Sequence, residues 1–182
     1  MLDRVREAMF SSLLPWIPDA RVLDLFAGSG SLGLEAVSRG AALARMVEED
    51  PGVLRVLERN VAALDLGRRA EIVPGDALDP GTWLRDAEPG FDVVFLDPPY
   101  PVMRDLAGRK LVLGRLAQLV RSGLAKDGVL VLHVPRDLLG PGDWEPGLVF
   151  RERSYGSSSL FYVQPDEEPE DEGTREEERR ER

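Results

Sequence analysis

The chain has 182 residues, of which 43% are hydrophobic and 31% charged, and this length fits one domain of ordinary size. It contains no cysteine and one histidine, which excludes disulfides, thiolate metal sites and cysteine nucleophiles and speaks against most zinc and Ser-His-Asp chemistry, so no metal is expected. No apolar run approaches ~20 residues and no apolar stretch follows Met1, so we expect a cytoplasmic protein without a membrane helix or secretory signal.

The formal net charge of −10 is unevenly distributed. Residues 165–182 hold ten acidic residues and four arginines, so this segment carries −6 and residues 1–164 carry −4. Because residues 165–182 are nearly free of apolar side chains, we expect a disordered acidic tail there. Residues 1–164 form the predicted folded domain. Their mildly acidic balance lacks the basic surface typical of nucleic-acid binding and counts against an RNA substrate.

Apolar periodicity and turn residues predict helices and strands in alternation. In chain order, we expect a helix at 3–14, a strand at 21–26, a helix ending at 39, a strand at 43–47, a helix beginning at 51, a strand at 70–73, a short helix at 81–87, a strand at 91–97, a helix at 109–122, and strands at 128–134, 148–154 and 159–163. The expected buried side chains are Val5, Ala8, Met9 and Leu13 in the first helix, Val53, Leu54, Leu57, Val61 and Leu64 in the third, and Val112, Leu113, Leu116, Leu119 and Val120 in the fifth.

This alternation, closed by a hairpin, predicts a three-layer α/β architecture. The sheet would have seven strands, mostly parallel, with helices on both faces and an antiparallel hairpin at one edge. The strand FDVVFLD at 91–97 is almost wholly apolar, as is typical of a central parallel strand. No internal repeat is visible, so we expect a single domain.

Acidic residues stand at or just after the ends of four predicted strands: Asp24, Glu48, Asp76 and Asp97. In sheets of this kind, ligands bind beyond the carboxyl ends of the strands. The first strand also leads into a G-x-G-x-x-G turn at 28–33, where the missing side chains let the backbone approach a ligand closely. Glu48 follows Gly28 by 20 residues, which is the spacing of a ribose-binding acid. The sequence therefore predicts a nucleotide-cofactor site at this edge.

The charge of the predicted site distinguishes two cofactors. NAD carries a pyrophosphate, which favours bare N–H groups at a helix N-terminus, and Asp24 would repel it. S-adenosylmethionine (SAM) carries a cationic sulfonium and an ammonium group, which carboxylates attract. The acidic surroundings therefore favour the methyl donor.

The catalytic chemistry is predicted by Asp97-Pro98-Pro99-Tyr100. The two prolines keep the backbone extended and remove N–H donors, which leaves carbonyl groups free to accept. The Asp97 carboxylate beside such a carbonyl would bind both hydrogens of an exocyclic NH₂ group, and the ring of Tyr100 would hold the plane of the base. The amine lone pair would then face the methyl group, so that catalysis rests on positioning without a covalent intermediate. Adenine, cytosine, guanine and a glutamine amide all remain open as acceptors.

In the order of its motifs, the sequence resembles the RsmD family of 16S ribosomal RNA (guanine-N2)-methyltransferases. The resemblance covers almost all of residues 3–163 and is carried by RVREAMF (4–10), VLDLFAGSGSLGLEAVSRGA (22–41), VEED (47–50), Asn60, FDVVFLDPPY (91–100) and RSYGSSSLFYV (153–163). Many amino-methyltransferases share the glycine loop and Asp-Pro-Pro-Tyr, so RVREAMF and LGLEAVSRGA are the specific parts. The resemblance implies a Rossmann-like, class I SAM-dependent methyltransferase fold for residues 1–164.

The resemblance also implies roles for individual residues. Asp24, Gly28 and Gly30 would hold the methionine part of SAM, Glu48 the ribose hydroxyls, and Asp76 with the Ala77 backbone the adenine. Asp97 and the Pro98 carbonyl would bind the guanine amine, and Tyr100 would stack on a flipped-out base. The complete expected set is Asp97, Pro98, Pro99 and Tyr100 for catalysis, and Asp24, Phe26, Gly28, Ser29, Gly30, Glu48, Asp76 and Ala77 for the cofactor.

The implied partner is 16S rRNA in an assembled or assembling small ribosomal subunit, with no membrane contact, and a monomer is expected. Members of the family carry a basic hairpin before the RVRE helix, whereas Met1 lies almost directly on that helix here. We therefore expect either that the hairpin is missing or that the true start lies upstream. Alternatives are the same chemistry on DNA adenine, another RNA or a protein glutamine, or a cofactor-binding module that needs a partner for RNA contact.

The sequence also suggests roles for His133 and for a group of basic residues. His133, with apolar neighbours in the fifth strand, is expected to be a packed histidine of the core or the strand end. Basic side chains after the catalytic motif and in the first helix would either contact phosphates or form solvated helix faces. These are Arg104, Arg109, Lys110 and Arg115, and Arg4 and Arg6, for which the resemblance favours RNA.

Overall fold

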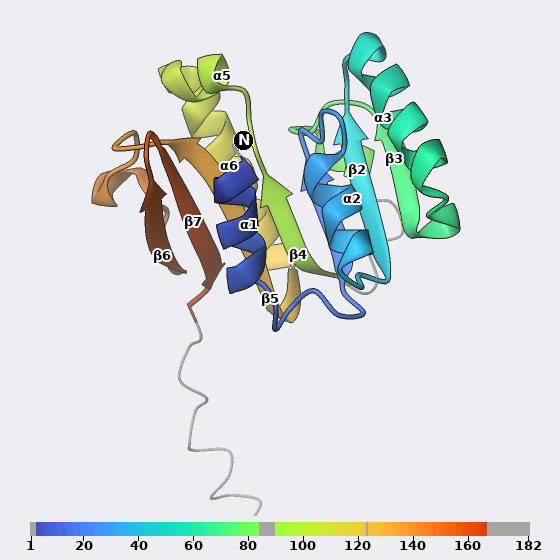
Figure 1. Cartoon of the computed structure of the whole chain (residues 1–182). Helices are drawn as coiled ribbons and strands as arrows, with labels where there is room; N and C mark the ends of the chain where they lie inside the picture. The colour runs from blue at the N-terminus through green and yellow to red at the C-terminus, as the bar shows by residue number, and fades with distance from the viewer. Residues whose placement is uncertain (1–2, 84–89, 123, 167–182) are drawn as a thin grey trace, which may run out of the picture.

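The computed structural model describes residues 3–83, 90–122 and 124–166. Most of the predicted acidic tail and the later part of the predicted helix at 81–87 lie outside the described residues. The described chain forms a seven-stranded sheet with helices packed on both faces (Figure 1). This arrangement confirms the predicted α/β fold with its antiparallel edge hairpin.

All seven predicted strands are present; six have bounds within two residues of those expected, and β5 begins four residues earlier than predicted. They are β1 (Arg21–Leu25), β2 (Leu43–Glu48), β3 (Ala70–Pro74), β4 (Phe91–Leu96), β5 (Leu124–Pro135), β6 (Leu148–Tyr155) and β7 (Ser158–Pro165). The helices are α1 (Asp3–Ser12), α2 (Ser31–Ser38), α3 (Pro51–Leu64), α4 (Pro80–Trp83), α5 (Tyr100–Arg104) and α6 (Leu106–Ser122), with 3₁₀ turns at Gly67–Arg69 and Pro141–Asp143. The sequence did not predict α5, which begins at Tyr100, the last residue of the Asp-Pro-Pro-Tyr motif.

The strand order β3-β2-β1-β4-β5-β7-β6 creates a switch point in the middle of the sheet. Strands β1 to β5 pair in parallel, and β7 runs antiparallel to both β5 and β6. From β1 the chain extends the sheet to one side as far as β3 and then returns to add β4 on the other side of β1. The connections that follow β1 and β4 therefore diverge, and a ligand can enter between them.

Three hydrophobic clusters hold the layers together, and the two larger ones lie on opposite faces of the sheet. Helices α1 and α2 pack on one face and α6 on the other (Figure 1). All five side chains predicted for the buried face of the last long helix are buried. In α1, Val5, Met9 and Leu13 are buried as predicted, together with Phe10, whereas Ala8 is only half-buried. These clusters fix the positions of the strand ends.

Helix α3 is less buried than its apolar stripe predicted. Leu57 is fully buried, Val53, Leu54 and Val61 are half-buried, and Leu64 is 54% exposed. The prediction for Leu64 is therefore wrong. Helix α3 packs on β3, the edge strand of the sheet, so no further strand covers the C-terminal end of the helix. Val53, near the N-terminal end of α3, is half-buried and lines a pocket.

Candidate functional site

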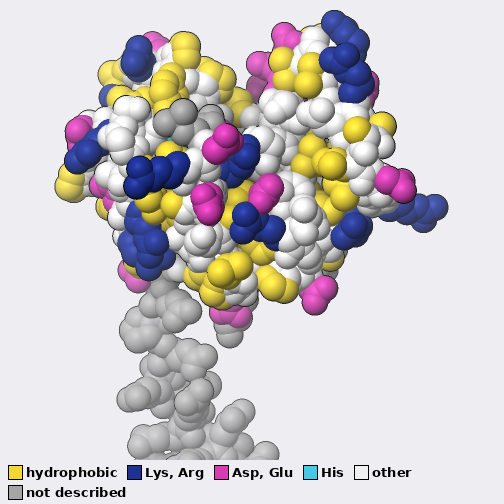
Figure 2. Space-filling model, in the orientation of Figure 1, with side chains coloured by type: hydrophobic (Ala, Val, Ile, Leu, Met, Phe, Trp, Pro, Cys, Tyr) yellow, Lys and Arg dark blue, Asp and Glu magenta, His cyan; other side chains and the backbone are white. Residues whose placement is uncertain are grey.

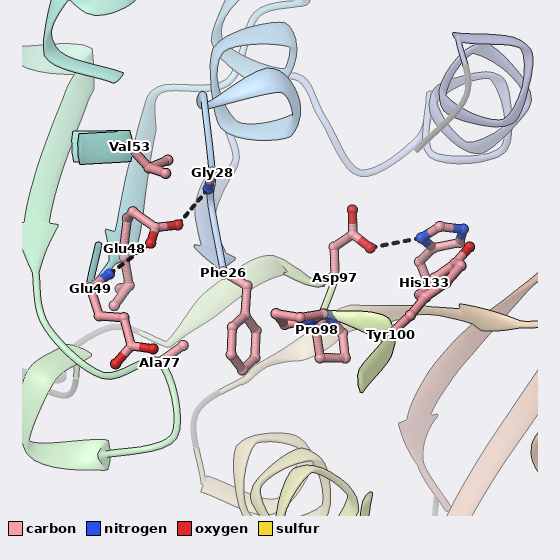
Figure 3. A pocket seen from close by; sticks show the side chains of 12 residues that line it. Phe26, Gly28, Glu48, Glu49, Val53, Ala77, Asp97, Pro98, Tyr100 and His133 are labelled. Carbon is pink, nitrogen blue, oxygen red and sulfur yellow. Dashed lines mark hydrogen bonds and ion pairs between the residues drawn. The ribbon is translucent and has the colours of Figure 1, made fainter. Parts of the chain in front are cut away.

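A pocket of about 420 Å³ lies at the carboxyl ends of β1, β2 and β4, where the switch point predicts a ligand site. Eight of the twelve predicted site residues line it: Phe26, Gly28, Glu48, Ala77, Asp97, Pro98, Pro99 and Tyr100. The other lining residues are Val47, Glu49, Val53 and His133 (Figure 3). The predicted cofactor and catalytic groups thus meet in one cavity.

The wall formed by β1 and β2 is tied together by the Glu48 carboxylate. Its Oε2 accepts the backbone N–H of Gly28 at 2.9 Å, and its Oε1 accepts the N–H groups of Glu49 at 3.0 Å and Asp50 at 2.9 Å (Figure 3). Gly28 has φ +58°, a left-handed conformation that favours glycine. The acid therefore holds the glycine turn in the form that borders the pocket.

Phe26 has an unusual backbone conformation beside this turn. Its φ is +62°, which is uncommon for a residue with a bulky side chain and concentrates at functional sites. The turn lets the Ala27 N–H donate to the Val47 carbonyl at 2.9 Å, and the Phe26 ring lines the pocket (Figure 3). The strand end is thus bent so that an aromatic side chain enters the cavity.

Asp24 lies beneath the glycine turn and does not line the pocket. It is 1% exposed; its Oδ2 accepts the N–H of Gly33 at 2.8 Å, and its Oδ1 has no hydrogen-bond partner among the described residues. Burial raises the pKa of the Asp24 carboxyl from 3.8 to about 7, the Gly33 hydrogen bond opposes this, and the negative charges of Asp97 and Glu48 add to it. Asp24 therefore supports the start of α2 from below.

The remaining predicted cofactor residues surround the pocket without lining it. A Cβ on Gly30 would collide with Leu57, so this glycine allows the turn to pack closely against α3. The Ser29 carbonyl accepts the side-chain N–H of Asn60 at 2.8 Å, and the exposed Asp76 accepts the N–H of Leu78 at 2.7 Å. These contacts indicate that Ser29, Gly30 and Asp76 stabilise the loops around the pocket. Their direct contact with a cofactor stays a prediction.

The opposite wall is formed by the Asp-Pro-Pro-Tyr motif at the end of β4. The Pro99 carbonyl accepts the N–H groups of Val102 and Met103 and so begins α5, whereas none of the described residues donates to the Pro98 carbonyl. The Tyr100 side chain is 36% exposed, with its hydroxyl 3.3 Å from Ser158 Oγ. An acidic side chain, a free carbonyl and an aromatic ring therefore border the same space.

His133 joins this group. It is 3% exposed, as expected for a packed histidine, but it also lines the pocket, and its Nδ1 lies 2.7 Å from Oδ1 of Asp97. Leu96 pairs with Leu132 across β4 and β5, so Asp97 and His133 are the next residues of two neighbouring strands. The sequence interpretation missed this contact; the signal was a lone histidine in the strand that pairs with the motif strand.

The basic residues proposed from the sequence are divided between inward and outward positions. Arg115 Nε donates to the Leu78 carbonyl at 2.7 Å and Arg109 Nη1 to the Leu138 carbonyl at 3.4 Å, so both brace loops. Arg104 and Lys110 are exposed, as is Arg4, and Arg6 pairs with Asp3 at 2.8 Å. Figure 2 shows basic side chains interspersed with acidic and apolar ones on the face in view.

The described part of the chain has neither a metal-binding cluster nor a membrane-spanning helix. Within residues 3–83, 90–122 and 124–166, no three His, Asp or Glu side chains are grouped so as to hold a metal ion. None of the helices in these ranges is long and apolar enough to cross a membrane.

The parallel sheet with an antiparallel β7 inserted before β6, the glycine turn after β1 and the acid at the end of β2 define a class I SAM-dependent methyltransferase fold. The family described as Conserved hypothetical protein 95 matches residues 1–164, and the chain belongs to this family. The resemblance to the RsmD family noted in the sequence is thereby confirmed.

Individual relatives agree with this assignment. Ribosomal RNA small subunit methyltransferase D of Escherichia coli K12 is 46% identical over 98 residues, which are 54% of this chain and 48% of the relative. The putative rRNA methyltransferase YlbH of Bacillus subtilis is 32% identical over 160 residues, covering 87% and 83% of the two chains. A solved structure described as putative methyltransferase yhhF from Escherichia coli has TM-score 0.72 and 33% identity, covering 91% and 86%. The chain spans about half the length of the first curated relatives that it matches.

Proposed function

We propose that this chain transfers a methyl group from SAM to the exocyclic N2 amine of a guanine in 16S rRNA. The observation that carries the proposal is the placement of Asp97, Pro98 and Tyr100 on the same pocket as Glu48 and the glycine turn. The relatives named as rRNA methyltransferases support the choice of RNA as substrate. Residues 1–164 would form the methyltransferase domain, and the acidic tail at 165–182 would follow it.

The pocket suits SAM in size and charge. A volume of about 420 Å³ is within the ordinary range for small-molecule sites. Glu48 and Glu49 border it at the end of β2, and their charges would attract the sulfonium and ammonium groups. The unpartnered Oδ1 of buried Asp24 adds a further acceptor next to the glycine turn. When bound, SAM supplies a methyl carbon on a positively charged sulfur, and the bond to sulfur breaks as the acceptor nitrogen attacks.

Residues on the β1–β2 side would orient the cofactor. Glu48 uses three of the roughly four acceptor positions of a carboxylate on backbone N–H groups, which leaves room for a ribose hydroxyl. Val53 and Ala77 offer apolar contacts for the faces of adenine, and the Ala77 backbone with Asp76 would read its edge. Phe26 would close the cavity beside the methionine part.

Residues on the β4 side would orient the acceptor. The Asp97 carboxylate and the Pro98 carbonyl would each accept one hydrogen of the guanine amine, while Tyr100 stacks on the base. Both hydrogens are then held in the plane of these acceptors, and the nitrogen lone pair is directed toward the methyl carbon. As the new C–N bond forms, the nitrogen releases one proton, for which the Asp97 carboxylate is the adjacent acceptor. Positioning accounts for most of the rate in such a site.

The proposed partner is the small ribosomal subunit, assembled or assembling, with the protein acting as a monomer in the cytoplasm. A particle would present a folded RNA surface, which suits a protein that intersperses basic side chains with acidic ones on the face in view in Figure 2. Exposed Arg4, Arg104 and Lys110 are the candidate phosphate contacts.

The experiment is to incubate the purified chain with isotope-labelled SAM and small subunits that lack the modification, and to identify the methylated nucleoside by mass spectrometry. The expected product is N2-methylguanosine in 16S rRNA, with transfer slowed by at least ~100-fold in an Asp97→Ala variant. A labelled adenine or a labelled protein glutamine would show that guanine is not the acceptor. SAM binding without transfer to any substrate would instead support a cofactor-binding module.

A further inference from the structure

Asp97 and His133 form a side-chain pair at the ends of β4 and β5. The Nδ1 to Oδ1 distance is 2.7 Å, within the range of a charge-assisted hydrogen bond. The His133 side chain is 4% exposed, whereas that of Asp97 is 24% exposed on the pocket side. The buried His133 ring thus holds the Asp97 carboxylate, which faces the cavity.

The direction of the hydrogen bond follows from its partners. A carboxylate only accepts, so Nδ1 of His133 carries the hydrogen. The other ring nitrogen, Nε2, is buried without a hydrogen-bond partner among the described residues. An N–H at that position would be a buried donor without an acceptor, which is unfavourable. The contact therefore places a hydrogen on Nδ1, directed at Asp97.

The contact fixes one oxygen of Asp97 and leaves the other available. Figure 3 shows one carboxylate oxygen directed at His133 and the second directed away from it. Without this contact, the Asp97 side chain could rotate about both of its side-chain bonds. With Oδ1 held by His133, rotation would remove a short hydrogen bond, so Oδ2 stays in one orientation at the pocket wall.

We propose that His133 is a positioning residue for methyl transfer, which holds Asp97 through Oδ1 so that Oδ2 accepts a hydrogen of the substrate amine. This inference rests on the proposed function for its chemistry, although the pair itself is measurable without any substrate. His133 does not touch the acceptor in this scheme and acts only through Asp97. The ring centroids of His133 and Tyr100 are 6.0 Å apart, so the histidine also adjoins the residue that would stack on the base.

The first test uses the fact that the chain contains one histidine. Labelling histidine with ¹⁵N therefore gives a single imidazole in the NMR spectrum of the full chain, and the two nitrogen shifts report which of them carries hydrogen. The expected result is hydrogen on Nδ1 in the wild type and a loss of that preference in Asp97→Ala. The control is Asp166→Ala, an exposed carboxylate at the far end of β7, which should leave the spectrum unchanged.

Two results of this test would overturn the proposal. One is a wild-type ring with its hydrogen on Nε2, and the other is an imidazole signal that does not respond to Asp97→Ala. Because no substrate is present, these results are independent of whether rRNA is methylated.

The second test separates positioning from packing by kinetics on small ribosomal subunits. His133→Leu fills similar space without a donor, and we expect kcat to fall by ~10–100-fold because the oriented acceptor is lost, with SAM affinity by calorimetry unchanged. His133→Asn places an amide N–H near the Nδ1 position and should recover most of that loss. In an Asp97→Ala background, His133→Leu should cause no further loss, as expected for residues that act as a unit.

Equal losses in His133→Leu and His133→Asn, or losses of His133→Leu and Asp97→Ala that add, would show that the histidine does not act through Asp97. If His133→Leu fails to fold, the His133→Asn kinetics and the NMR comparison still decide the question. A wild type that binds SAM but methylates nothing would refute the proposed function, and the NMR test would still decide the pairing.

Discussion

Oε2 of Glu48 accepts the backbone N–H of Gly28 at 2.9 Å, so the side chain at the end of β2 holds the turn that follows β1. Its other oxygen accepts two N–H groups at the start of the next connection. The same carboxylate therefore shapes one wall of the pocket and faces into it. Removing it should affect both the bound cofactor and the loop that surrounds it.

Glu48→Ala is expected to weaken SAM binding by ~1–3 kcal/mol, or about 5–150-fold in Kd, because a charge-assisted contact is lost. Isothermal titration calorimetry with SAM measures this directly. Glu58→Ala, an exposed acid on α3, is the matched control and should bind like the wild type. An unchanged Kd in Glu48→Ala would refute the ribose assignment.

Asp97→Ala should leave SAM affinity nearly intact and reduce the rate of methyl transfer by at least ~100-fold, because the acceptor amine loses the carboxylate that orients it. Single-turnover transfer to small subunits, paired with calorimetry, separates the two effects. Asp166→Ala provides the control for loss of a carboxylate. Normal transfer in Asp97→Ala would exclude the proposed acceptor mechanism.

Two substitutions of Tyr100 separate the effect of its ring from the effect of its hydroxyl. Tyr100→Ala should lower kcat/KM on small subunits by roughly 10–100-fold, the range expected for one base–aromatic stack. Tyr100→Phe keeps the ring and loses only the 3.3 Å contact with Ser158 Oγ, so it should retain most of the activity. Equal losses in both variants would assign the effect to the hydroxyl and argue against stacking.

The pocket was predictable because its parts follow from local patterns. A strand, a glycine turn and a helix favour a next strand that lies parallel to the first and beside it, which places the ends of β1 and β2 together. Glu48 and Gly28 consequently line the same pocket, and their direct hydrogen bond is a feature that the sequence did not predict. Asp97 and Tyr100 were found for the same reason, since their motif ends a strongly apolar strand.

Other features depend on pairings that the sequence does not state. The contact of Asp97 with His133 requires that β5 lie beside β4 in one register, and a shift of one residue would turn the histidine to the other face. The burial of Asp24 requires that α2 begin directly above it, where Gly33 donates to its carboxylate. Leu64 is exposed because α3 covers the edge strand, a position that apolar periodicity alone does not reveal.

Asp24 gives a prediction for stability against pH. Burial raises the pKa of its carboxyl from 3.8 to about 7, so between these values the folded state holds the proton more firmly than the unfolded chain. The contribution of Asp24 to the free energy of unfolding is therefore greatest at low pH, decreases as pH rises through this interval and levels off above pH 7. The rise in pKa corresponds to an upper limit of roughly 4 kcal/mol.

Because other carboxylates change the stability in the same pH range, the measurement is the difference between the wild type and Asp24→Asn, which does not titrate at this position. Urea unfolding at about pH 4.5, 6 and 8 should show the wild type losing ~1–4 kcal/mol relative to Asp24→Asn as pH rises. Asp166→Asn, at an exposed position, should give a difference that is flat across the three pH values. A flat difference for Asp24→Asn as well would mean that the Asp24 carboxyl has the same pKa in the folded and unfolded chains, in contradiction to its burial beneath the glycine turn.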